Sequence, residues 1–190
     1  MYKITSNFGA RESFRSSGHS GIDFAMENGE PLRSIRNGIV ERVVDYGNVN
    51  AGKCITVKWE DGKTAVYGHL SKFSVNEGDT VSVGDVLGYS GNSGFSTGSH
   101  LHFGLKENGH FIDPSPYLQD IQHMNDSNYF VQQTAEIKIN FFDYFQQHMD
   151  LVGGFLSDLK MNLIHFFIST DYSPLIQLFK HIIQFIFINI

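Results

Sequence analysis

The sequence predicts a mainly β protein, with an antiparallel β-sheet or sandwich domain in residues 1–119 and an α-helical, apolar tail in residues 120–190. Two distributions indicate this division, because 17 of the 19 glycines lie in the first part and 10 of the 17 phenylalanines lie in the second. The first part also alternates short apolar stretches with turn sequences, which is the pattern of antiparallel strands. A chain of 190 residues suits one such domain with an appendage better than two full domains.

Five stretches of the first part are expected to form strands, because turn sequences such as NAG, EDGK and ENG separate them. They are residues 38–46, 53–59, 64–70, 80–90 and 100–106. The segment SSGHSGIDF has Gly18 and Gly21 on either side of His19. We therefore expect an irregular loop that runs into a strand there, and no convincing helix before residue 115.

The tail is expected to form three helices, because apolar residues recur at helical spacing from about Asn128 onward. Gly153 and Gly154 would separate the first two, and Ser173 followed by Pro174 would begin the third. That third helix has a polar strip and a broad apolar face, so it would pack against other tail helices, lie in a membrane interface or assemble with a partner. It is too short and too polar to be predicted as a membrane span.

Charge, cysteine content and the N-terminus exclude several classes of protein. With 14 basic and 20 acidic residues the net charge is −6, and no basic stripe is present, so nucleic acid is not an expected partner. Cys54 is the single cysteine, which rules out an intramolecular disulfide, and it is expected to be buried. The N-terminus lacks the basic start and apolar run of a secretory signal, so classical export of this chain alone is not expected.

The residues that carry chemistry gather in three short motifs. His100 and His102 stand two residues apart in an expected strand, so both imidazoles leave the same face. His19 and Asp23 lie in the opening loop, and His69 lies in the stretch YGHLS. A catalytic zinc site typically uses three protein ligands from histidine and carboxylate and keeps a fourth position for water. These five residues are enough for one metal ion and its helpers.

These motifs resemble those of the lysostaphin-type, or LytM-like, zinc endopeptidases that cut peptidoglycan. HSGIDF, YGHLS and TGSHLHFGL occur in the order of that family, and residues 77–98 and the stretch IDPSPYL are also similar to it. The resemblance covers the chain from about Phe8 to Leu118. It implies a metallopeptidase domain in residues 1–119 that hydrolyses peptide bonds in the cross-bridges or stem peptides of the bacterial cell wall.

The resemblance also implies a role for each of the five residues. Carried over by position, it makes His19, Asp23 and His102 the Zn²⁺ ligands. His69 and His100 match the pair that activates water or stabilises the transition state, and which of the two is the base stays open. Lacking a signal sequence, such an enzyme would reach peptidoglycan through a phage particle, a holin lesion or a secretion machine.

Two other functions of the chain are considered besides that of an enzyme. One is a catalytically inactive peptidoglycan-binding or regulatory module, although all five positions are filled here. The other is a membrane-associated assembly protein in which the tail helices bind a membrane or a protein partner.

Tyr67 is a candidate for the wall of the cleft, whereas Arg11 is expected to be structural. The remaining histidines are expected at surfaces or interfaces; they are His110, His123, His148, His165 and His181.

Overall fold

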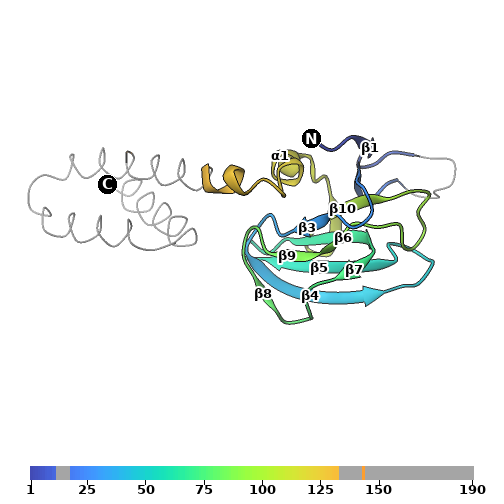
Figure 1. Ribbon diagram of the computed structural model, residues 1–190, viewed down its shortest axis with the longest axis horizontal. Coiled ribbons are helices and arrows are strands. Elements are labelled where there is room, and N and C mark those ends of the chain that lie inside the picture. The colour runs from blue at the N-terminus through green and yellow to red at the C-terminus, as the bar shows by residue number, and fades with distance from the viewer. Residues whose placement is uncertain (12–17, 133–142, 144–190) are drawn as a thin grey trace, which may run out of the picture. The chain divides into compact units, whose positions relative to one another are not determined.

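The computed structural model describes residues 1–11, 18–132 and 143, and within these the chain forms two β-sheets (Figure 1). The strands are β1 (Ile4–Ser6), β2 (Gly21–Ala25), β3 (Pro31–Arg33), β4 (Gly38–Asp45), β5 (Lys53–Trp59), β6 (Thr64–Leu70), β7 (Lys72–Phe73), β8 (Thr80–Val81), β9 (Val86–Tyr89), β10 (His100–Glu107) and β11 (His110–Ile112). The larger sheet has the order β1-β2-β10-β6-β5-β4-β8, with β11 also paired to β10, and the smaller sheet has the order β3-β9-β7. All of these strand pairs are antiparallel, so the predicted fold class is confirmed.

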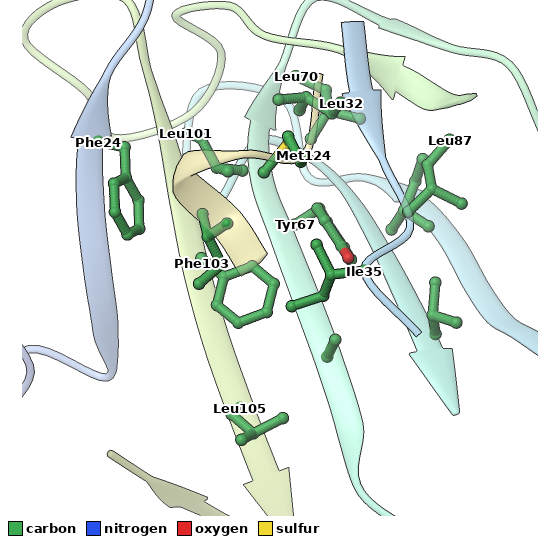
Figure 2. Close-up of a cluster of buried hydrophobic side chains, with 14 of the residues drawn as sticks. Phe24, Leu32, Ile35, Tyr67, Leu70, Leu87, Leu101, Phe103, Leu105 and Met124 are labelled. Atoms are coloured by element: carbon green, nitrogen blue, oxygen red, sulfur yellow. The ribbon is translucent and has the colours of Figure 1, made fainter. Parts of the chain in front are cut away.

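The core lies on one face of the larger sheet, where alternate residues of the central strands are apolar. On β10 these are Leu101, Phe103 and Leu105, none of which is exposed to solvent. Leu32 of β3 and Leu87 of β9 belong to the same cluster, so the smaller sheet packs over this face (Figure 2). The opposite face of β10 is left to His100 and His102, because side chains of successive strand residues point to opposite sides.

Tyr67 lies in this core and does not line a cleft, which corrects the expectation from the sequence. Its side chain is fully buried, and its ring meets the ring of Phe103 edge-on with 5.2 Å between the centroids. The period of two along β6 places residue 67 on the same face as the buried Ala65.

The stretch 80–90 forms two strands in different sheets, where one strand was predicted. β8 pairs with β4 in the larger sheet, whereas β9 lies between β3 and β7 in the smaller one. A tight turn separates them, in which the N–H of Asp85 donates to the carbonyl of Ser82 and Gly84 has a φ of 91°. Glycine adopts that conformation without the steric cost that other residues meet, so the chain can change sheets here.

The packed part of the chain continues beyond the last strand. A 3-10 turn (Ser115–Tyr117) and a short helix α1 (Leu118–Gln122) follow, and residues 127–132 are again helical. Ile121 and Met124 are almost completely buried in the core, and the compact unit runs from Met1 to Phe130. The boundary at residue 119 stays a prediction.

The tail predictions fall mostly outside the part of the chain that the structure describes. This holds for the three helices expected from about Asn128 onward, of which the structure describes only residues 128–132, which are helical, and residue 143, and it holds for His148, His165 and His181. Within the described residues, none of the helices has the length and apolar character needed to cross a membrane.

Candidate metal centre

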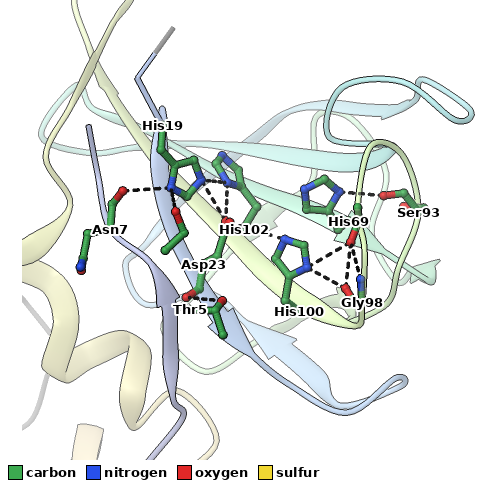
Figure 3. Close-up of polar contacts among 11 residues, drawn as sticks. Thr5, Asn7, His19, Asp23, His69, Ser93, Gly98, His100 and His102 are labelled. Carbon is green, nitrogen blue, oxygen red and sulfur yellow. Dashed lines mark hydrogen bonds and ion pairs between the residues drawn. The ribbon is translucent and has the colours of Figure 1, made fainter. Parts of the chain in front are cut away.

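The register of three central strands brings the first candidate residues together. In the pairing of β10 with β2, His102 lies directly opposite Asp23, and in the pairing of β10 with β6 it lies opposite Gly68. His102 and Asp23 therefore share the face of the sheet that points away from the core. His19 reaches the same place from the loop before β2 (Figure 3). Its backbone N–H donates to the carbonyl of Ala10.

Three atoms form the centre of the site. His19 Nε2 lies 3.0 Å from Asp23 Oδ1, His102 Nδ1 lies 2.8 Å from the same oxygen, and the two nitrogens are 3.0 Å apart. All three side chains are buried, and among the described residues they are the group whose donor atoms lie close enough together to hold one metal ion. Donor atoms bound to one tetrahedral zinc at 2.0–2.1 Å lie about 3.3 Å apart, so this set fits zinc in donor chemistry and nearly in spacing.

The loop around His19 fixes which ring nitrogen is available. His19 Nδ1 lies 3.1 Å from the carbonyl oxygen of Asn7 and 3.0 Å from Ser6 Oγ. Because a carbonyl oxygen only accepts hydrogen bonds, Nδ1 carries the proton and Nε2 presents its lone pair to the other donors. Such a supporting hydrogen bond orients a metal-binding imidazole and makes it more basic.

His69 and His100 lie beside this triangle with matching hydrogen bonds. His69 Nδ1 donates to the carbonyl of Ser93 over 2.7 Å, and His100 Nδ1 donates to the carbonyl of Gly98 over 2.8 Å. The two ring centroids are 4.5 Å apart. His100 Nε2 lies 3.8 Å from Asp23 Oδ1, and it is buried without a hydrogen-bond partner in the described part of the chain. Both rings thus keep Nε2 available for proton exchange.

Burial and polar contacts together set the protonation states of the groups in the site. Burial by itself would raise the pKa of the Asp23 carboxyl, but the close polar contacts of its carboxylate with the His102 and His19 rings hold that pKa well below its ordinary value. Burial lowers the pKa of His69 to about 4, although its hydrogen bond to Ser93 opposes the shift. Burial also lowers the pKa of His102, against the influence of Asp23. At neutral pH the Asp23 carboxylate therefore lies beside the neutral imidazoles of His69 and His102.

A β-bulge gives His69 its position. Between the pairs Lys53–Leu70 and Ile55–Tyr67, strand β5 contributes one residue and β6 contributes two, Gly68 and His69. His69 has a φ of 64°, in the left-handed region that non-glycine residues rarely adopt. Without the extra residue, His69 would share the core face with Tyr67, so the bulge is what turns its side chain to the metal side.

All five residues that the sequence singled out meet at one place, and a cleft of about 320 Å³ lies over Asp23 and His100. The supporting groups were not identified from the sequence. Three of them are backbone carbonyls, of Asn7, Ser93 and Gly98, and a carbonyl belongs to every residue type. Only the positions of these residues in the fold make them functional.

Comparisons with known proteins agree with this geometry. The model of a family described as "Peptidase family M23" matches residues 17–114. The glycyl-glycine endopeptidase ALE-1 of Staphylococcus capitis is 38% identical over 116 residues, which are 57% of this chain and 31% of that protein. The chain thus spans less than a third of the length of the curated relatives that it matches first.

Two solved structures share the fold. The catalytic domain of lysostaphin from Staphylococcus simulans has a TM-score of 0.56 and 34% identity, over 62% of this chain and 92% of that domain. A structure of LytU has a TM-score of 0.58 and 35% identity, over 65% of this chain and 91% of the other.

Proposed function

Because the chain belongs to peptidase family M23, whose members are zinc metallopeptidases, we propose that it hydrolyses peptide bonds of bacterial peptidoglycan. The resemblance to lysostaphin-type endopeptidases that the motifs indicated is confirmed by that membership. The bonds concerned would lie in cross-bridges or stem peptides, so the protein would act at the cell wall.

One observation carries the proposal: a buried triangle of two imidazole nitrogens and one carboxylate oxygen lies beside two further imidazoles. We assign His19, Asp23 and His102 as the residues that hold Zn²⁺. Zinc at that place would polarise the scissile carbonyl and lower the pKa of a bound water towards roughly 7. With one carboxylate and two neutral imidazoles as ligands, the site keeps a net positive charge, which suits the oxyanion of amide cleavage.

His69 and His100 supply the proton transfers in this proposal. Each holds its Nδ1 proton against a backbone carbonyl, so each can accept a proton at Nε2 from the attacking water and return it to the leaving amine. A pKa of about 4 keeps His69 neutral, and therefore able to accept a proton, at neutral pH. No serine or cysteine nucleophile is required.

Digestion of purified cell walls tests the proposal. The zinc-loaded full chain is incubated with peptidoglycan, and the released muropeptides are analysed by mass spectrometry with and without a chelator. We expect new amino termini that disappear with the chelator and return with added zinc. New reducing sugar ends would contradict a peptidase, and cleavage by a zinc-free sample would contradict the metal assignment. Bound zinc without any cleavage would favour the inactive binding module.

A further inference from the structure

The face of the larger sheet that carries the metal donors continues past them as a groove. The groove has a volume of about 680 Å³ and is lined by residues of β4, β5, β6, β10 and β11 and of the loops beside them. Ala51 belongs to its lining and lies next to the metal centre, because a Cβ built on Gly68 would be 3.0 Å from the Cβ of Ala51 and 3.3 Å from the Cβ of His102. The groove therefore begins beside the metal centre.

Strand pairing places successive rows of side chains along the floor of this groove. Gly104, Val66, Thr56 and Arg42 lie opposite one another across four strands in the row next to His102. Lys106, Thr64 and Lys58 make up the following row. Phe111 stands over the first row, since a Cβ built on Gly104 would be 3.0 Å from its ring.

The groove carries positive charge. Arg42, Lys58 and Lys106 line it, and Glu41 is the one acidic residue of the lining. In the described part of the chain, none of the three cations forms an ion pair, and the Lys106 ammonium lies 4.7 Å from the centroid of the Phe111 ring. The whole chain has a net charge of −6, so three unpaired cations in one groove depart from its general character.

The distance between Lys106 and the metal centre matches the length of a short extended peptide. Lys106 is four residues from His102 along β10, which corresponds to about 13 Å at 3.3 Å per residue. An extended peptide advances by a similar length per residue. A peptide whose scissile bond lies at His102 and that runs along β10 would thus place a residue about four positions away beside Lys106.

Resting on the peptidase function proposed above, we propose that Arg42, Lys58 and Lys106 form a subsite for free carboxylates of the substrate. The substrate is then an acidic stem peptide and not a neutral glycine bridge, because a glycine bridge has no side-chain carboxylates for these cations to bind. Each ion pair between a substrate carboxylate and one of these side chains is partly exposed to water and therefore weak. Selectivity for the acidic peptide thus arises from the three cations together.

Binding of two peptides tests the subsite independently of catalysis. The probes are a fluorescein-labelled stem pentapeptide with free side-chain carboxylates and the same pentapeptide with those groups amidated. Fluorescence anisotropy with the zinc-loaded full chain measures both dissociation constants. We expect the free acid to bind roughly tenfold more tightly than the amide, with a preference that declines as salt is added. The triple variant R42Q/K58Q/K106Q should lose the preference.

A matched control separates the groove from the overall charge of the chain. Lys3 and Lys72 are exposed and lie outside the groove, so the variant K3Q/K72Q should keep the preference. Equal binding of the two peptides by the unmodified chain, or an undiminished preference in the triple variant, would overturn the subsite. Failure to cleave peptidoglycan would instead count against the proposed function, because the anisotropy measurement does not depend on cleavage.

Discussion

His102 and Asp23 face each other across the pair of strands β10 and β2, with His102 Nδ1 at 2.8 Å from Asp23 Oδ1. Strand register alone decides whether this contact exists, because a slip of one residue would turn one of the two side chains to the core. The buried residues Leu101 and Phe103 on either side of His102 oppose such a slip, since it would expose them. The apolar core thereby aligns the metal donors.

Replacing Asp23 with Asn should remove most of the zinc affinity, because the amide keeps the shape of the side chain but loses its charge. We expect a loss of more than about 100-fold, since removing a residue that merely supports a ligand already costs 10–100-fold. Competition with a chromophoric chelator measures the affinity. Asp45→Asn, at an exposed carboxylate, is the control and should bind zinc normally. Normal zinc affinity of Asp23→Asn would rule out Asp23 as a ligand.

Replacing His69 with Asn should separate catalysis from metal binding. Asparagine tolerates the left-handed backbone conformation of residue 69, so the fold and the zinc content should be retained. The kcat for peptidoglycan cleavage should fall by about 10²–10⁴-fold, which is the usual contribution of a general acid or base. His110→Asn, at an exposed histidine, should leave kcat unchanged. Loss of zinc from His69→Asn would instead indicate that His69 is a ligand.

Replacing Gly21 with Ala should disturb the contact between β2 and β10. The new Cβ would be 2.3 Å from the carbonyl oxygen of Phe103 and 2.8 Å from His102 Cε1, so the strands must move apart. We expect the free energy of unfolding to fall by about 1–3 kcal/mol and zinc to bind more weakly. Thermal unfolding followed by circular dichroism gives the first quantity. In the control Gly98→Ala, the added Cβ meets open space, so this variant should unfold at the same temperature as the unmodified chain.

The sequence predicted those parts of the site that follow from strand period. Residues 53–59 and 64–70 form strands with the expected bounds, because turn sequences delimit both. His100 and His102 share a face for the same reason. The period of two would have placed His69 in the core with Tyr67, and only its motif identified it. The bulge that turns it outward depends on the pairing with β5, which no local sequence pattern reveals.

Local sequence patterns also could not predict where the chain passes from one sheet to the other or where the packed unit ends. Residues 80–90 have strand character throughout, and only the competition between two sheets for their pairing divides them into β8 and β9. Ile121 and Met124 follow the last glycine of the β region, so composition assigned them to the boundary or the tail. Their burial depends on contacts with strands that lie far away in the sequence.

Cys54 should react slowly with thiol reagents at neutral pH. Burial raises the pKa of its thiol to about 11, so at pH 8 only about one molecule in a thousand carries the reactive thiolate. Alkylation by iodoacetamide should accelerate as the pH rises towards 11, and at pH 8 unfolding in urea should increase it at least 100-fold. Because the folded-state pKa lies above the unfolded one, this thiol also stabilises the fold below about pH 8.5 and loses that contribution as the pH approaches 11. Equal rates at pH 8 in the folded and unfolded protein would contradict the burial of Cys54.

Two truncations should show where the packed domain ends. A chain that stops at residue 119 lacks Ile121 and Met124, which are 0% and 1% exposed, and lacks Asp120, whose carboxylate accepts a 2.6 Å hydrogen bond from Arg36. Removing each buried apolar side chain costs about 2–5 kcal/mol, which together approaches the 5–15 kcal/mol that stabilises a typical domain. A chain that stops at residue 132 keeps all of these contacts. We therefore expect residues 1–132 to unfold cooperatively on heating and residues 1–119 to be largely unfolded at 25 °C; a cooperative transition of residues 1–119 at the same temperature would place the boundary at 119.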